Sequence, residues 1–385
     1  MSQYAVIDCE TTIFQKGHPY SARNSLCLVG IRINNINHVF DMEYSLRPYH
    51  QQREKIIGLV NSVDLIVGFN LKFDLAWLKR YGIDFSHCQI WDCQLAEFLG
   101  SNQSIPFPSL EDTVAKYHLG TKSTFIDENY WSLGIDTPDI PLPELTEYLE
   151  NDLFITDRLY QHQLRTIPQL VRNLLYLQNE DLLVLLEMEY NGIRFDFGAM
   201  ERKSQDVQRE LEEINQPLSK YANGWPHFNW NSGDHLSTLL YGGTIEIKVG
   251  IPYAHTYLSG PKVGTTETRH RWETVTQSFP RLYEPIEGSE LQKPGFWSTD
   301  EATLKTLKGN KDLIKLLLKR AEMEKWLGTY LKGIPKKHRE MDWPGDIVHG
   351  TFNQCGVITG RLSSSKPNLQ NLDPRINEYI ITRFA

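Results

Sequence analysis

Residues 4–12, YAVIDCETT, decide how the N-terminal half of the chain can be interpreted. The run from Tyr4 to Asp8 is rich in apolar and β-branched residues, and it predicts a β-strand. Alternate residues of a strand share a face, so Asp8 and Glu10 are expected to point the same way. Two carboxylates in a low-dielectric site repel each other, and a cation is the simplest compensation. A pair of exposed edge acids is the alternative that this short pattern leaves open.

Two further segments place acidic side chains on helices. Residues 68–74, GFNLKFD, run from a strand into a helix and put Asp74 in the first helical turn, where the helix dipole favours a carboxylate. Tyr148 and Asp152 are four residues apart in a predicted helix, so the phenol and the carboxylate lie on one face. A capping aspartate and a half-buried tyrosine beside a surface acid are the alternatives.

Four carboxylates and a phenol are hard oxygen ligands, which suit Mg²⁺ or Mn²⁺ better than zinc. Two such ions about 4 Å apart can stabilise both the attacking and the leaving oxygen of a phosphoryl displacement. Tyrosine is too weak an acid to be the main base at neutral pH, so Tyr148 is assigned the task of orienting the attacking water. The sequence thus predicts two Mg²⁺ (or Mn²⁺) ions held by Asp8, Glu10, Asp74 and Asp152.

The chain has 385 residues, which is long for one domain. Its first 165 residues alternate short strands with helices and predict an α/β domain with a mixed sheet. From about residue 169 long helices dominate, including one that a cap cluster at 298–301 opens and that continues through Arg320. Residues 242–297 lack a helical period and are expected to form strands and loops. The remaining expected strands are 26–33, 38–40, 65–69 and 90–92, and the remaining expected helices are 71–81, 94–99, 145–163, 170–190 and 198–221.

The charge is unevenly distributed along the chain. Residues 1–165 carry 13 Lys and Arg against 21 Asp and Glu, whereas residues 303–339 carry 11 basic against 3 acidic side chains. This distribution makes sense if the acids hold cations and the basic stretch binds a phosphate backbone. A solvated helix face is the alternative for the basic stretch.

Composition excludes several other classes of protein. With 40% hydrophobic and 23% charged residues, the chain has the balance of a soluble globular protein. No uncharged apolar run approaches the ~20 residues that span a bilayer, and the N-terminus does not look like a signal peptide. The five cysteines include no C-x-x-C pair, so no zinc knuckle or disulfide framework is expected. We therefore expect a cytoplasmic protein without a membrane partner, in a bacterium or a phage-infected host.

The three acidic segments together resemble the exonuclease motifs of the DEDDy 3′–5′ exonucleases. The matching patterns are Asp8-x-Glu10, Asn70-x-Lys72-Phe73-Asp74 and Tyr148-x-x-x-Asp152. Their order and separation are similar to those in the proofreading domain of family A DNA polymerases, the bacterial polymerase I group and its phage relatives. The resemblance implies a ribonuclease-H-like fold, a DNA contact at Asn70, and catalytic roles for the residues Asp8, Glu10, Asp74, Tyr148 and Asp152.

The second half of the chain extends this resemblance. Residues 186–193, LEMEYNGI, resemble the start of the polymerase thumb, and residues 359–371, TGRLSSSKPNLQN, are similar to the segment that grips the primer–template duplex. Arg361 is a planar, permanently charged fork that suits minor-groove edges and sugars. The basic stretch would lie along duplex phosphates. The DNA-binding residues implied are Thr359, Arg361, Ser365, Asn368, Gln370 and Asn371, with Lys315, Lys319 and Arg320 in the basic stretch.

The resemblance also implies a division into three parts. These are a DEDDy exonuclease domain at 1–168, a mostly α-helical thumb at 169–340 with an insertion at about 242–297, and the start of the polymerase palm at 341–385. The palm aspartates and the fingers of the family are not found in the sequence. We therefore expect a second polypeptide to supply the rest of the palm and the fingers. The alternative is that this sequence is one piece of a longer chain.

The function expected from the sequence is the 3′–5′ proofreading exonuclease of a DNA-directed DNA polymerase in replication. It would act on the single-stranded primer 3′ end and grip primer–template DNA. Two alternatives stay open, namely a non-catalytic DNA-binding or assembly half of a split polymerase and a stand-alone RNA-trimming exonuclease.

Overall fold

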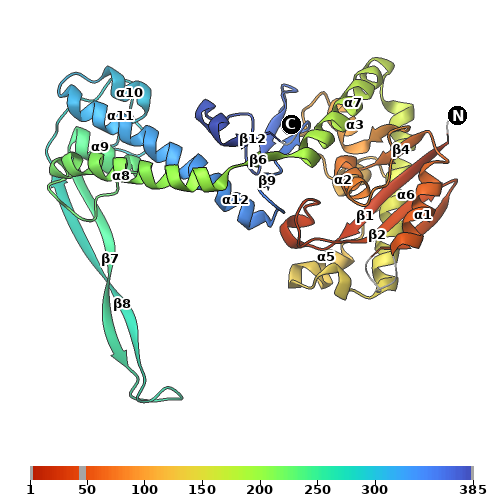
Figure 1. Cartoon of the computed structure of the whole chain (residues 1–385), viewed down its shortest axis with the longest axis horizontal. Coiled ribbons are helices and arrows are strands. Elements are labelled where there is room, and N and C mark those ends of the chain that lie inside the picture. The colour runs from red at the N-terminus through yellow and green to blue at the C-terminus, as the bar shows by residue number, and fades with distance from the viewer. Residues whose placement is uncertain (1–2, 43–48, 383–385) are drawn as a thin grey trace. The chain divides into compact units, whose positions relative to one another are not determined.

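The computed structural model describes residues 3–42 and 49–382, and it divides the chain into two compact units (Figure 1). Residues 1–199 together with 333–385 form the first, which we call the sheet unit. Residues 200–332 form the second, which we call the helical unit. The three-part division expected from the sequence stays a prediction.

The sheet unit contains the mixed sheet that the sequence predicts. Its strand order is β3-β2-β1-β4-β5, with β1 antiparallel to β2, β2 antiparallel to β3, and β1, β4 and β5 parallel. The strand at 26–33 has its expected bounds, whereas β1 runs three residues beyond Asp8 and therefore carries Glu10 as well. The strands are β1 (Tyr4–Thr11), β2 (Leu26–Ile33), β3 (Ile36–Asp41), β4 (Leu65–Gly68) and β5 (Gln89–Asp92).

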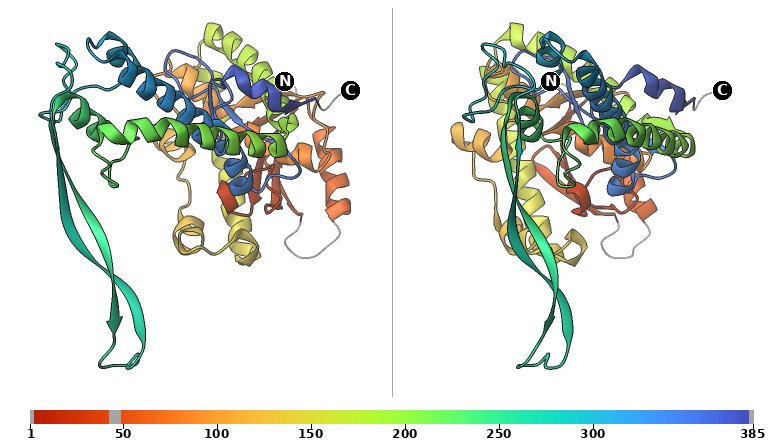
Figure 2. Two further views of the ribbon diagram at one scale, coloured as in Figure 1. Left: turned by 60° about the vertical axis from the view of Figure 1, so that its left-hand side comes forward. Right: turned by 90° about the vertical axis from the view of Figure 1, so that its left-hand side faces the viewer.

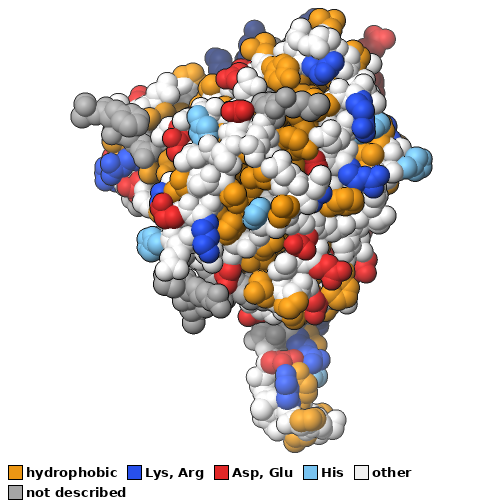
Figure 3. Space-filling model, turned by 90° about the vertical axis from the view of Figure 1, so that its right-hand side faces the viewer, with side chains coloured by type: hydrophobic (Ala, Val, Ile, Leu, Met, Phe, Trp, Pro, Cys, Tyr) orange, Lys and Arg blue, Asp and Glu red, His pale blue; other side chains and the backbone are white. Residues whose placement is uncertain are grey.

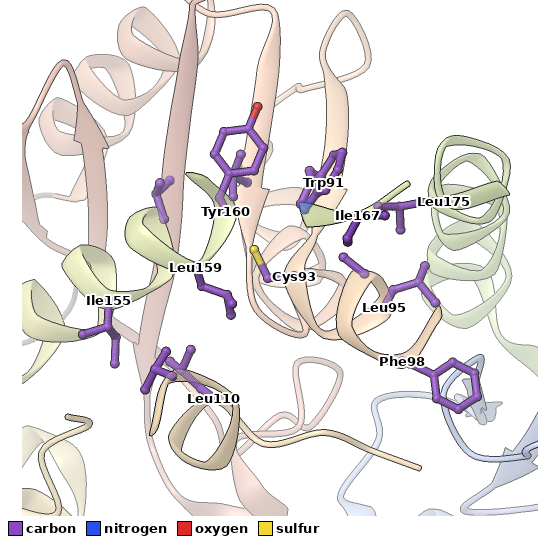
Figure 4. Close-up of a cluster of buried hydrophobic side chains, with 14 of the residues drawn as sticks. Trp91, Cys93, Leu95, Phe98, Leu110, Ile155, Leu159, Tyr160, Ile167 and Leu175 are labelled. Atoms are coloured by element: carbon purple, nitrogen blue, oxygen red, sulfur yellow. The ribbon is translucent and has the colours of Figure 1, made fainter. Parts of the chain in front are cut away.

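Helix α6 (Leu142–Thr166) lies directly on the sheet. A Cβ on Gly30 in β2 would stand 2.8 Å from Leu153 Cδ1, so this close approach needs glycine. On the same side, Trp91, Phe98 and Ile155 belong to one buried hydrophobic cluster, which Figure 4 shows. Burying a side chain of this size contributes roughly 1.5–3 kcal/mol, so the cluster fixes α6 against the strands. The other helices here are α1 (Tyr49–Val60), α2 (Leu71–Arg80), α3 (Cys93–Gly100), α4 (Leu110–Lys116), α5 (Phe125–Asn129) and α7 (Gln169–Asn191), with 3₁₀ turns at Phe14–Lys16, Trp131–Leu133 and Thr137–Asp139.

The C-terminal residues add two small sheets to the sheet unit. One has the order β12-β6-β9, and the other is the antiparallel pair β10-β11, in which Thr351 is opposite Ser365. The strands of these two sheets are β6 (Ile193–Phe195), β9 (Ile347–Val348), β10 (Thr351–Asn353), β11 (Ser363–Ser365) and β12 (Ile380–Ile381). This region also contains helix α12 (Gly333–Met341) and a 3₁₀ helix (Pro374–Tyr379).

In the helical unit, the single helix expected from residue 301 through Arg320 is wrong, because the chain forms two helices there. Helix α10 (Glu301–Thr306) ends before Lys308-Gly309-Asn310, and α11 (Lys311–Lys325) begins after it. The Asn310 side chain caps α11 by accepting from the backbone N–H groups of Asp312 and Leu313. The remaining helices are α8 (Phe197–Tyr221), which begins at the unit boundary, α9 (Gly233–Tyr241) and a π-helical turn (Trp326–Leu331).

The segment at 242–297 contains a long antiparallel hairpin of β7 (Gly243–Thr256) and β8 (Thr266–Phe279). Figure 2 shows it as a twisted two-stranded ribbon. Only its base is buried, where Ile245 and Phe279 pack with Phe228 and Leu239. Farther along, Trp272 is 69% exposed, so most of the hairpin has no described segment covering it.

On the face shown in Figure 3, basic, acidic and hydrophobic side chains are interspersed, and no large region of that face carries charges of one sign. Among the described residues, no helix has the length and apolarity needed to cross a membrane.

Candidate active site

The two acids of the first segment lie where the parallel part of the sheet ends. The last β1–β4 pair is Val6 with Val67, so Asp8 and Glu10 extend beyond it. Alternation places both on the face of Val6, which packs in the cluster with Leu153 of α6. Carboxyl ends of parallel strands are where open α/β sheets usually bind ligands, and the two acids occupy that edge.

Asp74 reaches the same edge from α2, as the sequence predicts. It lies in the first turn of the helix and is only 2% exposed. Its Oδ1 accepts a hydrogen bond of 3.0 Å from the backbone N–H of Cys9, the residue between Asp8 and Glu10. This bond ties the second acidic segment directly to the first.

Tyr148 and Asp152 reach the site from α6, and both are buried. Trp131 packs edge-on against the Tyr148 ring, with 5.6 Å between ring centroids. A cavity of about 560 Å³ opens beside Tyr148 and is lined by Thr121, Lys122 and Asn151 among others. The phenol is therefore held by packing while one side of the ring adjoins open space.

The four carboxyl groups are close enough to disturb one another's ionisation. Burial, together with the charge of Asp152, raises the pKa of Asp8 from 3.8 to about 7. Burial and the charges of Asp8 and Asp152 raise the pKa of Glu10 well above its usual range. Burial and the charge of Asp8 do the same to the pKa of Asp74. The structure thus gathers all four acids that the sequence singles out.

The phenol of Tyr148 is neutral at physiological pH. Burial raises its pKa, and the charges of Glu10 and Asp152 raise it further. A neutral phenol can donate a hydrogen bond and accept one, but it cannot take a proton from water. Its protonation state fits the orienting role that the sequence suggests.

Lys122 is a member of this site that the sequence analysis missed. It lies between α4 and α5, its Nζ donates a hydrogen bond to Asp152 Oδ2, and it stands 4.6 Å from the Tyr148 ring centroid. Burial alone would lower its pKa, but Asp152, Asp8 and Glu10 raise it on balance. A lone lysine in a polar loop gives no signal in the sequence, because its partner is 30 residues away.

Asp92 is a second residue of this site that the sequence analysis missed, although its position between a strand and a helix is a recognisable signal. It ends β5, caps α3 by accepting from the N–H groups of Gln94 and Leu95, and also accepts from those of Asn70 and Leu71. Burial raises its pKa to about 6, against the lowering effect of these hydrogen bonds. Asp92 therefore fixes the backbone that leads to Asp74, and an aspartate between a strand and a helix is the usual sequence signal of a cap.

The carboxyl groups of the four acids are of the chemical type that binds divalent cations, although they are not arranged as a complete metal-binding site. Asp152 Oδ1 is buried and, within the part of the chain that the structure describes, has no hydrogen-bond partner. The acids of the cluster offer carboxylate oxygens, which are the ligands that Mg²⁺ prefers, and Lys122 Nζ is bound to one of these oxygens. However, no group of three or more His, Cys, Asp or Glu side chains in residues 3–42 and 49–382 is arranged to hold a metal ion.

A buried ion pair links the second acidic segment to the C-terminal residues. Lys72 Nζ lies 2.5 Å from Glu189 Oε1 in α7 and also donates to the Phe352 carbonyl in β10. The same Glu189 oxygen accepts from the Phe352 N–H at 2.6 Å. Helix α2, helix α7 and strand β10 thus meet at one charged centre, two residues from Asp74.

The predicted DNA-gripping block lies on and around β11. The side chains of Thr359, Arg361, Asn368, Gln370 and Asn371 are exposed, and Ser365 is half-buried. The backbone turn is held by Ser364 Oγ, which accepts from the Leu369 N–H at 3.1 Å. Asn70 is also exposed and begins α2 in the left-handed conformation. All of these predicted DNA-binding side chains except the half-buried Ser365 lie at the protein surface.

The three basic residues predicted on the thumb differ in their surroundings. Lys315 and Lys319 are exposed on α11. Arg320 is 8% exposed, and its guanidinium donates to Asn215 Oδ1 at 2.9 Å and to Asn231 Oδ1 at 2.7 Å. Arg320 therefore holds elements of the helical unit together, and its contact with DNA stays a prediction.

Comparison with known sequences finds relatives over most of the chain. The profile of the family described as DNA polymerase family A matches residues 277–384. DNA polymerase I of Synechocystis is 26% identical over 343 residues, which is 85% of this chain and 30% of that protein. The thermostable DNA polymerase I of Thermus filiformis is 30% identical over 236 residues, which is 60% of this chain and 23% of that protein.

Comparison of structures finds the same fold. The POL domain of Pol1 from M. smegmatis, solved in complex with DNA primer-template and dNTP, superimposes with a TM-score of 0.64 and 16% sequence identity. The match covers 96% of this chain and 52% of that chain. The chain spans less than a third of the length of the two sequence relatives named above.

Proposed function

The chain is related over most of its length to the family A DNA polymerases, and on this premise we propose that its sheet unit is a 3′–5′ exonuclease that proofreads primer ends. The observation that carries the proposal is the meeting of Asp8, Glu10, Asp74 and Asp152 beside the neutral phenol of Tyr148. A purely structural role would not explain a cluster in which burial and neighbouring acids together raise the pKa values of Asp8, Glu10 and Asp74.

The proposed reaction is hydrolysis of the terminal phosphodiester. The oxygen of a water attacks the phosphorus, the bond to the 3′ oxygen of the preceding nucleotide breaks, and that oxygen takes up a proton. Two Mg²⁺ ions, held by Asp8, Glu10, Asp74 and Asp152, would supply an activated water and neutralise charge on the leaving oxygen.

The remaining tasks fall to this chain's own residues. The Tyr148 phenol, fixed by Trp131, would orient the attacking water through a hydrogen bond. Asn70 is exposed at the start of α2 and would hold the single-stranded 3′ end. Asp92 would keep this backbone in place.

DNA binding outside the reaction site is proposed for two surfaces. Arg361 and the exposed amides around β11 would contact the primer–template minor groove, where A·T and T·A pairs present the same acceptors. Lys315 and Lys319 would contact phosphates.

Hydrolysis assays with two substrates test the proposal. We expect Mg²⁺-dependent release of deoxynucleoside 5′-monophosphates from single-stranded DNA, and little release from RNA of the same sequence. Binding of primer–template without hydrolysis would contradict the proposal and favour a DNA-binding assembly subunit. Preferential release from RNA would favour an RNA-trimming exonuclease.

A further inference from the structure

The strongest unassigned feature of the molecule is the position of Lys122 among the acids. Its side chain is 22% exposed and that of Asp152 is 7% exposed, so the two do not form an ordinary surface ion pair. The ammonium also lies over the Tyr148 ring, which adds a cation–π contact. One lysine thus contacts both α6 residues of the proposed reaction site.

The backbone around Lys122 is built to hold it there. The Asn151 side chain donates to the Thr121 carbonyl at 3.1 Å, which ties the loop to α6 beside Asp152. At Gly120, φ is +151°, and a Cβ would stand 2.8 Å from Ile155 Cγ2. Only glycine permits this approach of the loop to α6. The backbone of the loop therefore places Lys122 next to α6, and this placement brings its ammonium to Asp152.

Four carboxyl groups meet one ammonium, that of Lys122, so the remaining charge is neutralised either by protons on the acids or by a further cation. Lys122 bonds one oxygen of Asp152, while the other oxygen is buried without a hydrogen-bond partner among the described residues. A lysine is a compact charge on a flexible stem, so it can leave a carboxylate when a stronger cation arrives. The cavity that Lys122 and Tyr148 line gives the ammonium room to move.

We propose that Lys122 is a built-in countercation, whose ammonium holds Asp152 in place when no metal is bound and competes with the divalent ion for that carboxylate. The inference rests on the proposed function, because it takes Asp152 to be a metal ligand. It explains why the acids gather here without forming a finished metal cage. Lys122 acts through Asp152 and is a positioning residue.

The test measures Mn²⁺ affinity without DNA, by the electron paramagnetic resonance signal of free Mn²⁺. Removing the competing charge in Lys122→Met should tighten the dissociation constant about tenfold, equivalent to about 1.4 kcal/mol. Lys122→Arg keeps the charge and should stay close to wild type. Lys116→Met is the matched control. Lys116 also pairs with a buried carboxylate, that of Glu97, and this ion pair lies outside the four-acid cluster.

A second readout is the melting temperature in EDTA. Lys122→Met should melt below wild type, because Asp152 loses its partner, and saturating Mn²⁺ should abolish the difference. If Lys122→Met does not fold, Lys122→Gln keeps a hydrogen-bond donor without the charge and should show the same tightening.

The outcomes separate the two proposals. If wild type binds Mn²⁺ and Lys122→Met binds it equally or more weakly, the countercation role is wrong and the nuclease proposal stands. If Lys116→Met tightens binding as much as Lys122→Met, the effect is general and the countercation role is also wrong. If neither wild type nor any variant binds Mn²⁺, both proposals are wrong.

Discussion

At the residue scale, Tyr148 offers a mild and specific change. Tyr148→Phe keeps the ring that packs against Trp131 and removes only the hydroxyl, so the stability should change by less than about 1 kcal/mol. Cleavage should slow by about tenfold to a hundredfold, because water loses its orienting partner while the acids remain. Single-turnover release of nucleotides measures the effect. A complete loss of cleavage would mean that the phenol does more than orient water.

Asp8 predicts an unusual dependence of stability on pH in the metal-free protein. Its pKa is about 7 in the folded state against an ordinary 3.8, so between these values the folded state holds a proton that the unfolded state has lost. The free energy of unfolding should therefore fall as pH rises from ~4 to ~7, by up to ~4 kcal/mol, since one pKa unit is worth about 1.4 kcal/mol.

Urea unfolding in EDTA at several pH values tests this slope. Asp8→Asn removes one titrating group and should reduce the slope, while the raised pKa values of Glu10 and Asp74 leave part of it in place. A wild-type curve that rises with pH over the same interval would show that the carboxyl cluster is not buried as described.

The residues that the sequence could identify were those with a pattern in it. Asp8 and Glu10 share a strand face, and Tyr148 and Asp152 share a helix face, so local spacing predicts their directions. Lys122 could not be found this way, because its bond to Asp152 depends on how the loop folds onto α6.

At the scale of elements, the Lys72–Glu189 pair predicts a strong effect of single substitutions. Lys72→Met should destabilise the protein by about 3 kcal/mol, because a buried carboxylate loses its cation. The double variant Lys72→Met/Glu189→Met should be less destabilised than the sum of the two single variants. Chemical unfolding measures this cycle. Strict additivity would show that α2, α7 and β10 are not coupled through this pair.

Helix α11 predicts a salt-dependent contact with DNA. If Lys315 and Lys319 contact phosphates, replacing both by Gln should reduce the slope of log affinity against log salt by about 2. Lys248→Gln/Lys262→Gln removes the same charge from the hairpin and is the matched control. An equal slope in wild type and the Lys315/Lys319 variant would return α11 to the solvated-face interpretation.

The spacing of hydrophobic residues predicts most helices and strands of the sheet unit. It fails where individual residues end a helix or cap the next one. The strand at 26–33 and the helix at 170–190 follow from their patterns almost to the residue. The break between α10 and α11 does not, because apolar residues continue in helical register while Gly309 and Asn310 end one helix and cap the next.

At the scale of the whole molecule, the hairpin β7–β8 should be separable from the fold of its unit. Residues 249–273 can be replaced by an Asn-Gly turn that joins Lys248 to Thr274, which are opposite each other in the ladder. The base cluster around Phe228 stays intact, so the melting temperature should change by less than about 4 °C, a shift that corresponds to roughly 1 kcal/mol. Circular dichroism measures it, and loss of cooperative unfolding would contradict this view.

The sequence predicts the mixed sheet and the strand-containing insertion, but it does not predict the two units of the structure. Residues 333–385 belong with the first 199 residues, and contacts this far apart in the chain leave no periodic signal. The Lys72 bond to Phe352 spans 280 residues and is one of the contacts that tie them together.

The most direct test of the central claim is nucleotide release by the double variant Asp8→Ala/Glu10→Ala with a single-stranded DNA substrate and Mg²⁺. Loss of both carboxylates should abolish release, while affinity for primer–template DNA, measured in the same preparation, should stay close to that of wild type. Continued shortening of the DNA by the double variant at the wild-type rate would contradict the claim that these acids form a nuclease site.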